Sequence, residues 1–314
     1  MESGQSLKRR MKSVANIGQI TKAMELVEAT KMRRSQELAL HSRPYAYAAL
    51  ELLGILSDLK DTDIEVPELL QERPVVRTAF LLMTSDRGLA GSFNSGVFRK
   101  FEQFVKANNI DIADHSKYSF IAVGQKAKTY LERRHANITA SFLRTGDLMK
   151  FSEAEPIADA LIQGYIAHDF DKVTAFFTTF VTALRQDAVQ RDFLPVTYES
   201  IKESVEETIP RAGRYANYAR SEAFMNGKDQ EYLIEPSPKE VLDELAPKLL
   251  KIRVYTSILE ANASEHSARR VAMKNASDNA ADLSTTLSMV YNKSRQAAIT
   301  NQIIEVTSGA QVGE

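Results

Sequence analysis

Apolar side chains recur at helical spacing in two long stretches, one toward each end of the chain. Toward the C-terminus, the stretch from Lys248 to Ser308 contains neither glycine nor proline, and Pro238 suits the first turn of a helix. A continuous helix over 248–308 would be about 90 Å long, whereas an ordinary globular helix has roughly 8–20 residues. The pattern therefore predicts a long helix within residues 236–314 that packs along another helix or projects into a partner.

Along this C-terminal helix, apolar residues at alternating steps of three and four form one stripe, as in a coiled coil. The first part of the stripe consists of Leu242, Leu245, Leu249, Ile252, Thr256 and Leu259. The second part continues through Leu283, Leu287, Val290, Ser294, Ala297, Asn301 and Ile304. Between them, residues 261–281 are rich in alanine and serine, which permits close approach of a second helix or a shaft thin enough to pass through a ring.

The N-terminal stretch, residues 1–59, predicts the second long helix. One narrow stripe consists of Ile17, Ile20, Met24 and Val27, and we expect it to form the seam of a coiled coil. Ser6 is a candidate N-cap, and Pro44 predicts a bend because it removes a backbone donor. Two such helices at opposite ends of the chain predict an antiparallel coiled coil. The apolar end at 298–306 predicts cover from another protein.

Between the two helices, residues 74–198 alternate between strand and helix patterns. Strands are predicted at 75–84, 118–123, 138–142, 173–184 and 192–198, and helices at 94–108, 125–134 and 153–167. This alternation is typical of a Rossmann-like α/β domain with a mainly parallel sheet. A polar connecting segment, residues 199–235, joins this domain to the C-terminal helix.

Composition narrows the class of protein. The net charge is −1 and there is no cysteine, which excludes a disulfide framework, a cysteine-based zinc site and a thiol nucleophile. No run of roughly 18 apolar residues predicts a membrane span, and no apolar leader is visible. The basic cluster at residues 8–12 has three interpretations: a solvated helix face, a nucleic-acid contact, or a contact with acidic surfaces of a protein partner.

In an α/β domain, the loops that follow the strands are the expected place for a ligand-binding or catalytic site. The glycines at 88 and 91 do not form a dinucleotide-binding motif, and residues 124–129 (GQKAKT) lack the second glycine of a phosphate-binding loop. The five histidines are scattered, and Ser264, Glu265, His266 and Ser267 are neighbours on a helix that point to different faces. The sequence therefore predicts no catalytic, cofactor or metal site.

Three segments carry a specific pattern. The first comprises residues 20–27 (ITKAMELV), 31–33 (KMR) and 42–45 (SRPY), and the second is residues 84–91 (TSDRGLAG). The third runs from 268–274 (ARRVAMK) through 278–279 (DN) to 291–300 (YNKSRQAAIT). With the helix–domain–helix order, these segments make nearly the whole chain resemble the gamma subunit of F-type ATP synthases, the central rotor shaft.

The resemblance implies a non-catalytic subunit that couples ion-driven rotation of the c ring to ATP synthesis or hydrolysis. The implied partners are three alpha and three beta subunits, the epsilon subunit and the c-subunit ring, without nucleic acid or direct insertion into the bilayer. The implied location is the cytoplasmic face of the bacterial plasma membrane. The implied contacts with beta subunits are Met24, Asp86, Arg87, Arg295, Gln296 and Thr300. The implied contacts with an apolar sleeve are Ile299, Ile303 and Ile304.

Two other functions stay open at this point. The α/β domain could belong to an enzyme or nucleotide-binding protein whose helical arms serve oligomerisation. Alternatively, the basic N-terminal helix could belong to a coiled-coil scaffold or a nucleic-acid-binding protein. The missing phosphate loop argues against the first, and the missing aromatic residues among the basic ones argue against the second.

Overall fold

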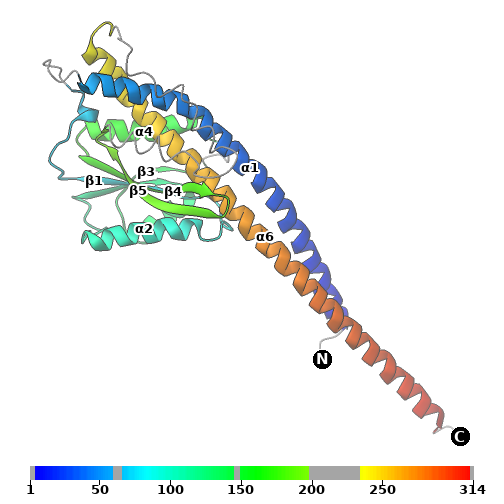
Figure 1. The fold of residues 1–314 in the computed structure, drawn as a ribbon. Coiled ribbons are helices and arrows are strands. Elements are labelled where there is room, and N and C mark those ends of the chain that lie inside the picture. The colour runs from blue at the N-terminus through cyan, green and yellow to red at the C-terminus, as the bar shows by residue number, and fades with distance from the viewer. Residues whose placement is uncertain (1–3, 59–65, 145–148, 198–233, 312–314) are drawn as a thin grey trace. The chain divides into compact units, whose positions relative to one another are not determined.

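The computed structural model describes residues 4–58, 66–144, 149–197 and 234–311 (Figure 1). The chain divides into two compact units, which are described separately. The helix-pair unit comprises Met1–Glu28 and Arg269–Glu314, and the sheet unit comprises Ala29–Ala268. The predicted connecting segment 199–235 lies, up to residue 233, outside the described residues.

The sheet unit is built on five strands in the order β3-β2-β1-β4-β5. The strands are β1 (Thr78–Met83), β2 (Tyr118–Val123), β3 (Ile138–Phe142), β4 (Lys172–Thr182) and β5 (Arg185–Leu194). The first four are mutually parallel, and β5 runs antiparallel to β4. The prediction of a mainly parallel α/β sheet is therefore confirmed.

The predicted last strand at 192–198 is wrong in its bounds. The chain turns back directly after β4, so β5 already begins at Arg185. The hydroxyl of Thr182 accepts hydrogen bonds from the amides of Leu184 and Arg185, at 3.3 and 3.1 Å, and this closes the turn. Because the turn contains neither glycine nor proline and β5 begins with charged residues, no sequence signal marked it.

Helices cover both faces of the sheet. The helices α2 (Phe93–Ala107) and α3 (Gln125–Glu132) pack on one face, where Phe80, Phe101, Phe120 and Phe176 form an aromatic core. The helix α4 (Phe151–Ile166) packs on the other face, on the opposite side of the sheet from α2 (Figure 1). Side chains alternate along β1, so Leu81 and Met83 belong to this second core.

The two long helices are α1 (Gly4–Asp58) and α6 (Pro238–Gln311), and a short 3₁₀ helix, η1, spans Glu68–Leu70. Their extents agree with the sequence, except that α1 includes Ser6 and therefore does not use it as an N-cap. The α1 helix continues through Pro44. Within the sheet unit, the predicted stripe of α6 is buried at Leu242, Leu245, Leu249, Thr256 and Leu259, and its first three leucines belong to the second core.

Within the helix-pair unit, α1 and α6 lie side by side and run antiparallel (Figure 1). Glu28 contacts Arg269, whereas Gly18, earlier in α1, contacts Ser277, later in α6. The covered positions of α1 recur at steps of three and four: Leu7, Met11, Val14, Gly18, Thr21, Glu25 and Glu28. The predicted antiparallel helix pair is therefore confirmed.

The predicted seam of α1 is wrong by one position. Ile17, Ile20 and Val27 are 53%, 59% and 51% exposed, and Met24 is only half-buried. Small and polar side chains face α6 instead, because Gly18 and Thr21 let the two backbones approach closely. On α6 the covered positions include Met273, Ala280, Leu287 and Ser294, while the predicted Leu283 and Val290 are 44% and 47% exposed.

Candidate functional site

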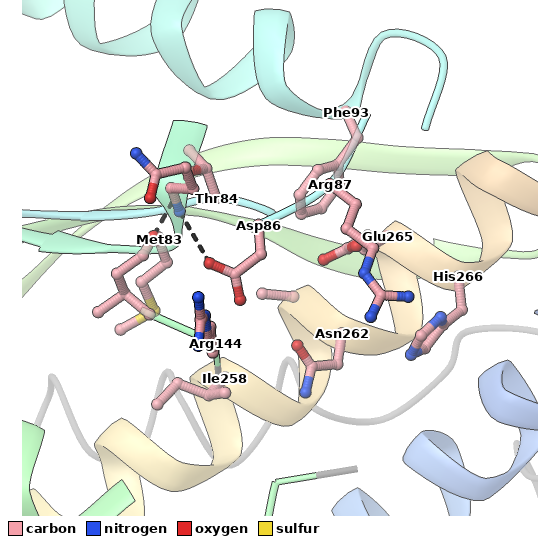
Figure 2. A pocket seen from close by; sticks show the side chains of 13 residues that line it. Met83, Thr84, Asp86, Arg87, Phe93, Arg144, Ile258, Asn262, Glu265 and His266 are labelled. Carbon is pink, nitrogen blue, oxygen red and sulfur yellow. Dashed lines mark hydrogen bonds between the residues drawn. The ribbon is translucent and has the colours of Figure 1, made fainter. Parts of the chain in front are cut away.

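A cavity of about 450 Å³ lies at the carboxyl end of β1 and β2 in the sheet unit (Figure 2). The β1–α2 loop, the start of α3, Arg144 and the part of α6 from Ile258 to His266 form its walls. Its polar lining side chains are Thr84, Asp86, Arg87, Gln125, Arg144, Asn262, Glu265 and His266. The carboxyl edge of a parallel sheet is where α/β proteins commonly bind ligands, so this cavity is the natural place to test for a phosphate site.

The amides that a phosphate would need are already occupied by the chain itself. The amide of Gln125 donates to Oδ1 of Asp86 at 2.9 Å, and this bond is the dashed line that ends at the Asp86 carboxylate in Figure 2. The next amides of α3 donate to the Ser85 carbonyl at 3.1 Å and to the Thr84 hydroxyl at 2.7 Å. A carboxylate of the protein thus takes the place at the helix N-terminus where a bound anion is stabilised in nucleotide-binding folds.

The β1–α2 loop is held from inside by Ser85 and Asn94. The amide of Ser85 donates to Oδ1 of Asn94 at 3.0 Å, and its hydroxyl donates to the Arg87 carbonyl at 2.6 Å. The tip then presents Leu89, which is 68% exposed and has a φ of 64°. A large apolar side chain in the left-handed region, facing solvent, is a costly arrangement that is typical of contact sites.

The loop therefore separates the two residues that the sequence singled out. Asp86 is half-buried and bound to α3, whereas Arg87 is exposed. Leu89 was missed by sequence reasoning, although an apolar residue within a glycine-rich turn is a weak signal for it. Arg87 and Leu89 together form an exposed charged and apolar tip.

The two serines that flank Glu265 and His266 in the sequence bond to backbone carbonyls. Ser264 donates to the Thr178 carbonyl on β4 at 3.3 Å, and Ser267 donates to the Ala183 carbonyl in the β4–β5 turn at 2.7 Å. Among the described residues, no three histidine or acidic side chains are close enough to hold a metal ion.

The helix-pair unit carries a separate surface. Ile17, Ile20, Met24 and Val27 follow one another along α1 on a face turned away from α6, and we call this the α1 stripe. On α6, every position from Arg295 to Ile304 is exposed, which includes Gln296, Thr300 and three isoleucines. Ile299, Ile303 and Ile304 are 47%, 61% and 55% exposed. The residues predicted to meet partners thus lie on uncovered surface, apart from Asp86 and Met24, which are half-buried.

Comparison with known proteins agrees with the fold. The ATP synthase family model matches residues 3–312. The ATP synthase gamma chain of Roseiflexus sp. (strain RS-1) is 35% identical over 316 residues, which cover 99% of this chain and 98% of the relative. That of Geotalea daltonii (strain DSM 22248 / JCM 15807 / FRC-32) is 37% identical over 311 residues, covering 99% of both chains.

Solved structures show the same fold at lower identity. A chain of the Euglena gracilis mitochondrial ATP synthase rotor in rotational state 1 has a TM-score of 0.58 and 18% identity, over 94% of this chain and 98% of that chain. A chain of the central stalk/c ring of Tetrahymena thermophila mitochondrial ATP synthase has a TM-score of 0.57 and 22% identity, over 82% and 99%. No helix in the described parts of the chain is long and apolar enough to span a membrane. By its match along nearly the full length, the chain belongs to the ATP synthase gamma-chain family.

Proposed function

We propose that this gamma chain works as the central rotor shaft of an F-type ATP synthase and contains no catalytic site of its own. The observation that carries the proposal is the α1 stripe, an apolar helix face that the chain's own second helix leaves uncovered. Burying a large apolar side chain contributes roughly 1.5–3 kcal/mol, so a row of them favours a permanent protein partner. The occupied amides at the start of α3 support the non-catalytic part of the proposal.

The mechanism follows from contact alone. In the proposal, one shaft stands inside three alpha and three beta subunits and presents a different face to each beta subunit. A ligand shifts a conformational equilibrium only by its differential affinity for the two states, and the shaft acts as that ligand. Turning the shaft takes each nucleotide site of the beta subunits through states of different affinity. In the proposal, the epsilon subunit and the c ring contact the other end of the shaft. The complex lies on the cytoplasmic face of the membrane.

We assign the proposed partner contacts to three surfaces: the end of α6, the α1 stripe and the β1–α2 loop. Arg295, Gln296 and Thr300 on α6, with Met24 in the α1 stripe, would meet the beta subunits, and Ile299, Ile303 and Ile304 would meet an apolar sleeve. On the β1–α2 loop, Arg87 would meet a beta subunit together with Leu89. Asp86 remains a proposed contact, but one of its oxygens already accepts the Gln125 amide, so it also holds the loop in place.

The α1 stripe is tested by adding charge to it. Replacing Ile20 and Val27 with aspartate should lower the yield of assembled complex at least tenfold, because two carboxylates would be buried against the partner. Both side chains are more than half exposed in the chain alone, so the circular dichroism and thermal midpoint of the purified chain should change little. Leu184→Asp is the matched control, since Leu184 is 81% exposed at the β4–β5 turn. Normal assembly of the doubly substituted chain would overturn the proposed role of the stripe.

Changes near the end of α6 should affect coupling rather than folding. Replacing both Arg295 and Gln296 with alanine should lower ATP-driven proton pumping several-fold relative to ATP hydrolysis, because the proposed contacts with the beta subunits would be lost. Folding should not change, because both side chains are exposed in the chain alone. Asn292 and Lys293, exposed one turn earlier, provide the control pair. Pumping and hydrolysis are measured on the same membranes. A fully coupled enzyme with both alanines would remove these two residues from the proposed contacts.

Nucleotide binding by the sheet unit is the competing function. We expect no ATP binding by the purified full-length chain up to millimolar concentration, because the first amides of α3 already have acceptors within the protein. Equilibrium dialysis with radiolabelled ATP measures this directly. Saturable binding at micromolar ATP would contradict the proposal that the chain carries no nucleotide site.

A further inference from the structure

One ion pair is buried between the two helices of the helix-pair unit. Nη1 of Arg269 on α6 lies 3.4 Å from Oε2 of Glu28 on α1. The two side chains are only 6% and 8% exposed, respectively. A buried ion pair adds little net stability, because removing two charges from water costs about as much as their attraction returns. Net stability therefore does not explain why this ion pair is buried between the two helices.

The seam nearby is formed by small side chains and backbone groups, and the Ser277 hydroxyl makes a long contact of 3.5 Å with the Gly18 carbonyl. A Cβ at Gly18 would lie 3.4 Å from the Cβ of Ala280, so the helices meet there through small groups. The Thr21 hydroxyl bonds to carbonyls of its own helix, at 2.9 Å to Ile17 and 3.1 Å to Gly18. A move of one heptad would place Gly18 opposite Met273 or Leu287, and Ala280 opposite Met11 or Glu25. Each shifted seam still pairs a small residue with a larger one, so packing discriminates only weakly between registers.

We propose that Glu28 and Arg269 are positioning residues that set the register of α1 against α6. A shift of one heptad in one direction places Glu28 opposite Ala276, and a shift in the other direction places Arg269 opposite Thr21. Neither new neighbour carries a charge, so each shifted arrangement leaves a buried charge without its counter-ion, which is strongly unfavourable. The same device, a single buried polar position, sets register in coiled coils.

The inference deepens the proposed function and rests on it in one respect. A shaft made of two helices transmits torque only if the helices do not slide along each other under load. The register claim itself concerns the chain alone and can be tested without rotation.

Cysteine pairs can report the register, because the natural chain has no cysteine. Gly18→Cys with Ala280→Cys reports the observed register, since the 3.4 Å separation is close to the roughly 3.5–4.5 Å between the Cβ atoms of a disulfide. Gly18→Cys with Leu287→Cys, or with Met273→Cys, reports a shift of one heptad in either direction. Disulfide yield under mild oxidation is measured on the purified full-length chain for each reporter.

Each reporter is placed in four backgrounds: the natural pair, Glu28→Gln, the apolar pair E28L/R269M and the exchanged pair E28R/R269E. With the natural pair, the observed-register reporter should exceed both shifted reporters at least tenfold. The apolar pair should keep the thermal midpoint but reduce that preference below threefold, and the exchanged pair should restore it. A purely structural role would not produce restoration on exchange. Should Glu28→Gln fail to fold, the apolar pair still decides.

A tenfold preference that persists in E28L/R269M would overturn the inference and leave the proposed shaft function untouched. The reverse failure is also distinguishable. Loss of preference in the purified chain, combined with unchanged proton pumping by the assembled enzyme, would uphold the register role and count against the requirement for a rigid shaft. Loss of both would support the two together.

Discussion

Replacing Gly124 with alanine is expected to destabilise the sheet unit by more than about 3 kcal/mol. Gly124 joins β2 to α3 with a φ of 89°, a conformation that glycine adopts freely and side-chain-bearing residues do not. An added Cβ would lie 2.1 Å from the carbonyl oxygen of Thr84, which is backbone and cannot rotate away. The amide of Gly124 also donates to the Phe142 carbonyl at 2.9 Å, so the residue cannot shift without breaking the link to β3.

Urea unfolding of the full-length chain, followed by circular dichroism, measures this change. Gly88→Ala is the matched control, because a Cβ there has no atom within 4 Å. We expect it to change the free energy of unfolding by less than about 0.5 kcal/mol. Similar unfolding midpoints for the two variants would show that the stability of the sheet unit does not depend on glycine at position 124.

Replacing Asp171 with alanine is expected to cost about 3–5 kcal/mol, the usual effect of breaking a buried ion pair on one side. Its Oδ2 accepts the amides of Val76 and Arg77 at 2.9 Å each, and its Oδ1 lies 2.9 Å from Nε of Arg73. The Arg73 guanidinium in turn donates to the carbonyls of Tyr165 and Phe170 and lies over the Tyr165 ring. Loss of the carboxylate leaves this largely buried cation without its counter-ion, and it leaves the amides of Val76 and Arg77 without their acceptor.

The same network predicts a pH dependence. Burial by itself raises the pKa of Asp171, but the amides of Arg77 and Val76 and the charge of Arg73 outweigh it and lower the pKa below its ordinary value of 3.8. A lowered pKa in the folded chain means that the carboxylate stabilises the fold above the ordinary pKa and loses this effect as the pH falls through the lowered value. The difference in unfolding free energy between the natural chain and Asp171→Asn should therefore shrink below about pH 4.

An exposed aspartate provides the control for both measurements. Asp187 pairs with Arg185 at 2.8 Å at the surface, where such pairs contribute at most about 1 kcal/mol. Asp187→Ala should therefore unfold at nearly the same urea concentration as the natural chain. An Asp171 variant as stable as the Asp187 variant would refute the role assigned to the buried network.

Sequence reasoning succeeded where one local pattern decides the outcome. The strands β2 and β3 have the predicted bounds, because the apolar run that ends β2 and the alternation of apolar and polar residues in β3 both favour strands. It failed for the start of β5, where charged residues extend an edge strand that tertiary pairing with β4 stabilises. In the same way, no local signal shows that Asp86 binds the amide of Gln125, 39 residues later in the chain.

By itself, the sequence determined the two long helices, the α/β class and the family. These follow from the periodicity of apolar residues and from motifs that each consist of residues close together in the chain. Only the tertiary structure decided which face of α1 packs against α6. Periodicity tells which side chains share a face, but not which face a neighbouring helix covers. Gly18 permits close backbone approach and Glu28 finds Arg269, so this small and polar face is buried and Ile17, Ile20 and Val27 stay exposed.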